Sequence, residues 1–143
     1  MNKQKIPQSE VKDFKVSLKL KLASLWTSFM FLYIYVDYFH LFMPGALEDL
    51  SAGRVFVFEI TQAFLLVALA TVTIPALMIF LSIFLAANVN RCTNIFVATI
   101  YIPFTLFNLA GEVWMHMVFG AAVEVVLLCL IIVYAWKWPR MEA

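Results

Sequence analysis

Four long apolar runs, separated by short polar stretches, dominate the chain. They cover residues 22–43, 60–87, 93–110 and 113–136. Each is near or above the roughly 20 residues that a helix needs to cross the core of a bilayer. Because backbone groups in lipid must form hydrogen bonds within their own segment, we expect these runs to be helical. The pattern predicts an all-α fold, a four-helix transmembrane bundle over residues 22–138.

Short polar or Pro-Gly segments predict where the helices end. Pro44-Gly45 closes the first apolar run, and Ala46–Gly53 after it reads as a short acidic surface turn or helix. Tight connections are expected at Asn88–Arg91 and at Ala110–Glu112, which would make successive spans antiparallel neighbours. The second and third runs each contain one proline, at which we expect a kink: Pro75 and Pro103.

Basic residues predict the orientation of the spans. Residues 1–21 form a basic, amphipathic segment leading into the first span, and residues 139–143 form a short tail. Nine of the ten Lys and Arg residues lie on one side of the predicted bundle, which leaves only Arg54 on the other side: Lys3, Lys5, Lys12, Lys15, Lys19, Lys21, Arg91, Lys137 and Arg140. Cytoplasmic loops carry such an excess, so both termini are expected in the cytoplasm.

Composition supports a membrane protein and argues against several other classes. The chain of 143 residues is 64% hydrophobic and only 13% charged, whereas soluble domains are near 45–50% apolar and roughly 25% charged. A net charge of +1 gives no reason to expect nucleic acid as a partner. Cys92 and Cys129 form neither a CxxC motif nor a zinc pattern. The expected partners are the lipid bilayer and, for a carrier of this size, a second copy of the chain.

Polar residues recur at helical spacing within each span. Because lipid cannot satisfy these groups, we expect each stripe to face the interior of the bundle. Gly120 would allow a neighbouring helix or a ligand to approach closely. The four stripes are Tyr33, Asp37 and His40; Glu59, Gln62 and Thr73; Tyr101, Thr105, Asn108 and Glu112; and His116, Gly120 and Glu124.

Counting residues inward from Trp26 and Trp136 at the inner interface, and from Thr93 at the start of the third span, places several polar groups at one depth. At a rise of about 1.5 Å per residue, Asp37 and Glu124 both lie roughly 17–18 Å from that interface. His40 and Asn108 come at about 21–22 Å, while Glu112 and His116 lie near ~30 Å as the mouth of a site. We therefore expect Asp37, His40, Asn108 and Glu124 to point into a shared cavity, with spans one and four close together.

Three interpretations of these groups remain open. They could form hydrogen bonds that hold the helices together, as in a structural or assembly protein. They could bind a small ligand, an ion or protons, because a carboxyl group can share a proton with a nearby imidazole. They could instead serve a metal- or haem-dependent oxidoreductase, although Asp37-x-x-His40 and Glu112-x-x-x-His116 match the di-iron pattern poorly. The pattern favours a binding protein over an enzyme and identifies no catalytic residue, metal site or cofactor.

Four stretches resemble a family of small bacterial membrane proteins catalogued as a domain of unknown function. They are Tyr35–Gly45 (YVDYFHLFMPG), Ile74–Phe84 (IPALMIFLSIF), Asn88–Ile95 (NVNRCTNI) and Tyr134–Pro139 (YAWKWP). The resemblance implies four spans in a bacterial cytoplasmic membrane. It implies no activity, cofactor or functional residue.

Overall fold

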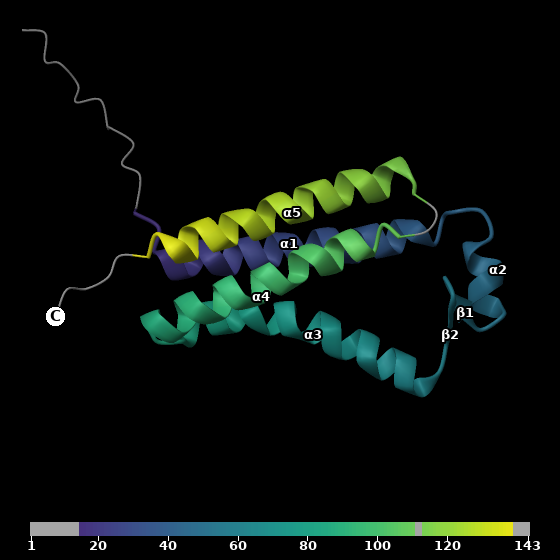
Figure 1. Cartoon of the computed structure of the whole chain (residues 1–143), viewed down its shortest axis with the longest axis horizontal. Helices are drawn as coiled ribbons and strands as arrows, with labels where there is room; N and C mark the ends of the chain where they lie inside the picture. Colours follow the sequence, from purple (N-terminus) through teal and green to yellow (C-terminus); the bar gives the residue numbers. More distant parts are fainter. Residues whose placement is uncertain (1–14, 111–112, 139–143) are drawn as a thin grey trace, which may run out of the picture.

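A computed structural model describes residues 15–110 and 113–138 and contains four long helices with a small subdomain between the first two (Figure 1). The long helices are α1 (Leu18–His40), α3 (Gln62–Phe84), α4 (Ala87–Phe107) and α5 (Met115–Trp136). The subdomain consists of α2 (Ala46–Ser51), β1 (Arg54–Val55) and β2 (Phe58–Glu59). The described residues are therefore mostly helical, with one long helix within each predicted apolar run or overlapping it.

Both ends of α1 follow from local sequence. The side chain of Ser17 accepts a hydrogen bond from the Leu20 amide at 3.3 Å and so caps the helix. At the other end, the amides of Leu41, Phe42 and Met43 each bond to the carbonyl three residues earlier. This tighter 3₁₀ pattern ends the helix at His40, before Pro44, because a proline disfavours helical geometry in the residue that precedes it. Of the predicted amphipathic segment, residues 1–14 lie outside the described part, and Lys15–Ser17 are not helical.

The subdomain contains one predicted and one unpredicted element. The helix α2 lies within the predicted acidic segment and carries Glu48 in its first turn. The β-hairpin was not predicted, and it makes the fold not strictly all-α. Arg54 faces Glu59 and Val55 faces Phe58 across its antiparallel pair. The residue that opens the turn, Phe56, has φ +60°, which is uncommon for a bulky side chain.

The connection between α3 and α4 differs from the prediction. The residues predicted as a loop, Asn88–Arg91, lie in the first turns of α4, and the connection consists of Leu85 and Ala86. Both connecting residues are extended, with ψ of 148°. The prediction was wrong because the amide side chain of Asn90 is buried, whereas polar runs usually mark solvent-exposed loops.

That asparagine belongs to a fully buried hydrogen-bond network near the α3–α4 connection. The Trp26 indole donates to Asn94 Oδ1 at 2.7 Å, and the Ser82 hydroxyl donates to the same oxygen at 3.2 Å. Asn94 Nδ2 donates to Asn90 Oδ1 at 2.6 Å, and Asn90 Nδ2 donates to the Ser82 carbonyl at 2.6 Å. All four side chains have a relative exposure of 0%. The network ties α1, α3 and α4 together with neutral groups that satisfy one another.

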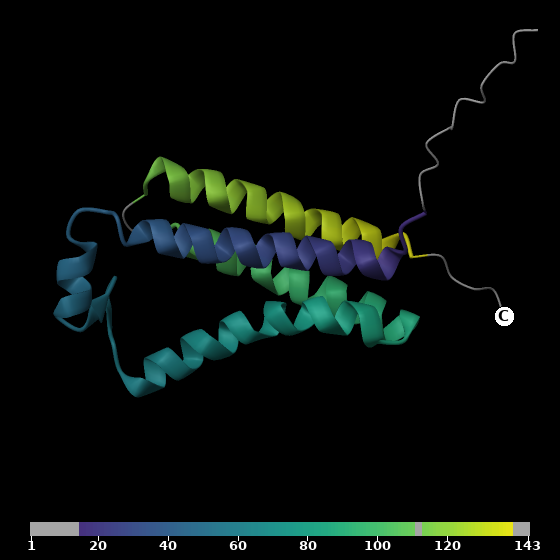
Figure 2. The ribbon, with the colours of Figure 1, turned by 180° about the vertical axis from the view of Figure 1, so that it is seen from behind.

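The long helices pack around α1, which contacts both α3 and α5, while α4 packs mainly on α5. Leu22, Trp26, Phe29, Leu128 and Ile131 form much of the core. Helix α3 bends near its middle, where Pro75 lies, and diverges from α4 away from their shared connection (Figure 2). This divergence leaves space at the end of the bundle that carries the subdomain.

The prediction that Gly120 permits close approach is confirmed. A Cβ atom built on Gly120 of α5 would lie 2.4 Å from Val36 Cγ2 of α1. Any larger residue at this position would force the Val36 side chain or the helices to shift. The contact lies one residue before Asp37 on α1 and one turn before Glu124 on α5.

Within residues 15–110 and 113–138, three helices are long and apolar enough to cross a membrane: α1, α3 and α5. Many large apolar side chains on them face outward, such as Phe31 on α1, Leu66 on α3 and Phe119 on α5. Exposed apolar side chains in such number are typical of a protein that sits in lipid. The pattern agrees with a membrane protein.

Candidate functional site

A cavity of about 530 Å³ lies in the half of the bundle that carries the subdomain. Its walls come from the C-terminal halves of α1 and α4 and the N-terminal halves of α3 and α5. The α2 helix and the β-hairpin also line it. The cavity forms where α3 diverges from α4, because the two helices do not pack against each other at this end of the bundle.

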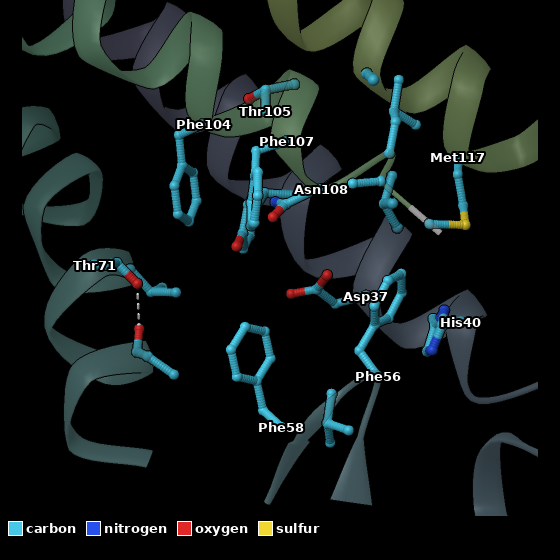
Figure 3. Close-up of a pocket in the computed structure, with 18 of the residues that line it drawn as sticks. Asp37, His40, Phe56, Phe58, Thr71, Phe104, Thr105, Phe107, Asn108 and Met117 are labelled. Carbon is cyan, nitrogen blue, oxygen red and sulfur yellow. Dashed lines mark hydrogen bonds between the residues drawn. The ribbon is translucent and has the colours of Figure 1, made fainter. Parts of the chain in front are cut away.

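Two carboxyl groups from different helices face this cavity. Asp37 of α1 points toward its centre (Figure 3). Glu124 of α5 also lines it, although its side chain is only 4% exposed. The Thr105 hydroxyl donates a hydrogen bond to Glu124 Oε2 at 3.2 Å. Among the described residues, neither carboxyl forms an ion pair with Lys, Arg or His.

Helical spacing brings further polar groups to the same cavity. Tyr33 precedes Asp37 by one turn of α1, and His40 follows it by slightly less than one turn. Asn108, the C-cap residue of α4, also lines the cavity. The structure thus brings together four of the six predicted site residues: Asp37, His40, Asn108 and Glu124.

The other two predicted site residues do not join this group. His116 lines a separate cavity of about 350 Å³ with Phe39, Phe42, Met43 and Trp114. Its buried Nε2 atom has no hydrogen-bond partner among the described residues. The prediction that His116 forms the mouth of the acidic site is therefore wrong, because counting residues along a helix gives depth but not direction around the bundle. Glu112 lies outside the described residues.

The predicted polar stripe of the second span is also wrong. Glu59 lies in β2, and Glu59, Gln62 and Thr73 are all exposed and absent from the cavity wall. Thr73 satisfies its hydroxyl by donating to the Leu69 carbonyl of its own helix at 2.7 Å. Such a bond removes the need for an interhelical partner, so a threonine is weak evidence for an inward face.

Sequence reasoning missed the contribution of the subdomain. Arg54 and Asp49 line the cavity near the hairpin, and the rings of Phe56 and Phe58 face it as well. The one available signal was the placement of Arg54 as the single basic residue on its side of the bundle. The aromatic residues gave none, because an apolar run without a turn dipeptide resembles the start of a membrane span.

Aromatic rings complete the walls. Phe56 and Phe58 come from the hairpin and Phe104 and Phe107 from α4, and Figure 3 shows the Asp37 carboxylate between these two pairs. The ring of Phe58 also stacks on that of Phe64 in α3, with centroids 5.8 Å apart. The cavity therefore presents carboxylates within a mostly apolar, aromatic enclosure, as small-molecule sites commonly do.

The donor groups do not gather as a metal or haem centre would require. Among residues 15–110 and 113–138, no three His, Cys, Asp or Glu side chains form a cluster that could hold a metal ion. The two histidines line different cavities, so His40 and His116 do not face a common haem. The described side chains therefore give no support to the oxidoreductase interpretation.

Comparisons with known proteins identify the family. The family described as "Family of unknown function (DUF6326)" matches residues 10–143. No curated protein and no solved structure matches the chain. The match covers all four long helices, the subdomain and every residue of the cavity wall. The predicted resemblance to a family of unknown function is thus confirmed, and the chain belongs to the family of unknown function DUF6326.

Proposed function

We propose that this protein crosses the bacterial cytoplasmic membrane four times and binds a small ligand, an ion or protons in the cavity that Asp37 and Glu124 face. The observation that supports this most strongly is the pair of carboxyl groups from two helices on one cavity, without a cationic partner among the described residues. Ionisable groups within membrane spans are costly, and they usually mark a path or site for ions, protons or substrates.

The polarity of α4 supports a fourth span. Its 21 residues extend over roughly 30 Å, enough to cross a bilayer core. Its polar residues Asn90, Asn94 and Thr105 are buried, while Phe96 and Leu106 are exposed. This arrangement is the reverse of a helix in water, and it suits a helix whose outer face contacts lipid.

The placement of charges supports cytoplasmic termini. The start of α1 and the end of α5 lie at the same end of the bundle (Figure 1), where Lys21 lies over the Tyr134 ring at 5.6 Å. Arg91 lies over the Trp136 ring at 5.5 Å at that end, and Arg54 lies at the other end. Basic residues with aromatic neighbours are typical of the cytoplasmic interface. The cavity then belongs to the outer half of the bundle.

The two ends of the bundle differ in a way that argues against a purely structural role for the acids. Near the α3–α4 connection, the helices are joined by Asn, Ser and Trp side chains that satisfy one another. Neutral groups of this kind give interhelical bonds without the cost of removing a charge from water. Asp37 and Glu124 carry that cost while facing an open space, which favours an exchangeable partner.

Reaction with a hydrophobic carbodiimide tests whether the cavity carboxyls exchange protons. Dicyclohexylcarbodiimide adds to protonated carboxyl groups, and rearrangement leaves a stable N-acylurea that mass spectrometry can locate. We expect labelling of Asp37 or Glu124 that decreases as the pH rises, because only the protonated group reacts. Asp37→Asn and Glu124→Gln should each remove the label at their own position, while the exposed Glu48 of α2 serves as the internal control. Labelling confined to Glu48 and other surface acids would contradict the proposal.

A further inference from the structure

The cavity wall combines charge and aromatic surface in a way that defines a ligand class. We propose that the ligand is an organic cation, an ammonium group carrying apolar substituents, held by the Asp37 carboxylate and the surrounding phenylalanine rings. This inference rests on the proposed function, because it requires the cavity to be a binding site. It adds the chemical nature of what binds there.

The charges on the wall favour a cation. Three carboxyl side chains line the cavity, from Asp37, Asp49 and Glu124, against one guanidinium from Arg54. Arg54 lies opposite Glu59 across the hairpin, so an acidic residue stands at the paired position of the other strand. His40 is the remaining titratable side chain on the wall besides Tyr33. An anionic ligand would meet this excess of carboxylates and is therefore disfavoured.

The aromatic residues favour an organic cation over a metal ion. A bound inorganic ion needs several oxygen ligands close together, and the described residues provide no group of three acidic or metal-binding side chains. Phe56, Phe58, Phe104 and Phe107 instead line the same cavity as the Asp37 carboxylate (Figure 3). Aromatic faces attract ammonium groups, and cages of such rings recognise quaternary ammonium ligands.

The size of the cavity and the origin of its rings fit the same class. A volume of about 530 Å³ lies within the range of small-molecule sites. Two of the rings come from a hairpin whose first turn residue, Phe56, has φ +60°. A bulky residue in this conformation requires compensation from its surroundings, and such residues concentrate at ligand-binding sites. Contact with a ligand beneath the hairpin would provide that compensation.

Thermal unfolding of the purified full chain, followed by tryptophan fluorescence, tests the inference with matched probes. The probes are benzyltrimethylammonium, its uncharged carbon isostere neopentylbenzene, the anion benzenesulfonate, and sodium ion. A ligand that binds only the folded protein raises the melting temperature with concentration, which yields an apparent Kd. We expect benzyltrimethylammonium to raise it, and the other three to have no effect or a much smaller one.

Substitutions of the wall test the two recognition elements separately. Phe58→Leu and Phe104→Leu keep apolar volume but remove the ring. Each should raise the apparent Kd for benzyltrimethylammonium by about threefold or more. Asp37→Asn should abolish its effect. Phe80→Leu is the control, because Phe80 is exposed on α3 and lies outside the cavity wall. Should one phenylalanine variant fail to fold, the other carries the test.

The possible results separate the inference from the proposed function. Equal stabilisation by neopentylbenzene would show an apolar or lipid site and overturn the inference. Stabilisation by sodium alone would contradict the inference that the ligand is an organic cation, but it would support an ion site. The absence of a response to any probe, while the carbodiimide still labels Asp37 or Glu124, would contradict the same inference and leave the proposed ion or proton site standing. If no probe acts and neither carboxyl is labelled, both proposals fail.

Discussion

The hydroxyl of Tyr101 in α4 donates a hydrogen bond to the carbonyl of Thr71 in α3. Thr71 lies four residues before Pro75, whose ring nitrogen has no proton to donate to that carbonyl. The tyrosine therefore satisfies the backbone group that the proline leaves free. It also joins α3 to α4 near the point where the two helices diverge around the cavity.

Tyr101→Phe is expected to destabilise the fold, because it leaves the Thr71 carbonyl without a donor. The cost of one such buried group is about 1–3 kcal/mol. In a Pro75→Ala background the restored amide can bond to Thr71, so the cost of Tyr101→Phe should become smaller. Unfolding free energies of the two single variants and the double variant measure this coupling, with the exposed Tyr35→Phe as control. Equal costs in both backgrounds would show that the bond does not compensate for the proline.

Gly120→Ala is expected to weaken the packing of α1 on α5. A methyl group at this position would lie 2.4 Å from Val36 Cγ2, and overpacking of this kind costs about 1–3 kcal/mol. The sign of the change in stability is informative, because replacing glycine by alanine at an open helix position stabilises the protein by up to about 1 kcal/mol. Adding Val36→Ala should recover most of the loss in melting temperature. A stabilised Gly120→Ala variant would contradict the close approach.

Asn94→Ala is expected to be among the most destabilising substitutions in α4. It removes the acceptor of the Trp26 and Ser82 bonds and the donor to Asn90. Each buried group left without a partner costs about 1–3 kcal/mol. Asn88→Ala, at an exposed position of the same helix, is the control and should have little effect on the melting temperature. Similar melting temperatures for the two variants would show that the network does not hold the helices.

Sequence pattern predicted the long helices well because an apolar run of about 20 residues has few alternatives in lipid. It also predicted the role of Gly120, since a glycine between polar residues on one helical face implies a close neighbour. It misplaced Asn90, because the burial of this amide depends on the Ser82 carbonyl across the α3–α4 connection and on Asn94, whose side chain also accepts from Trp26 of α1.

The cavity was predicted in part, for a similar reason. Helical spacing and depth placed Asp37, His40, Asn108 and Glu124 at one level, and the structure brings them to one cavity. Neither spacing nor depth fixes the rotation of a helix about its axis, so His116 was assigned to the wrong cavity. The hairpin that carries Phe56 and Phe58 depends on an uncommon backbone angle that no turn motif announces.

Reporter fusions test the proposed topology. A fusion after Ala143 should be active with a reporter that works only in the cytoplasm and inactive with one that works only in the periplasm. A truncated fusion after Gly53, between α2 and the hairpin, should show the opposite pattern. Activity of the periplasmic reporter after Ala143 would show that the topology is the reverse of the proposed one. The cavity would then lie in the inner half of the membrane.

The most direct test of the central claim is the melting temperature of the Asp37→Asn, Glu124→Gln double variant, with and without benzyltrimethylammonium. Both substitutions keep hydrogen-bonding capacity, including an acceptor for Thr105, and both remove a charge from the cavity wall. If the acids serve a bound cation, the variant should melt at the same temperature as the unmodified protein or higher, and the probe should no longer shift it. A melting temperature several degrees lower, with the shift by the probe retained, would show that the two acids hold the bundle together and that the cavity binds without them.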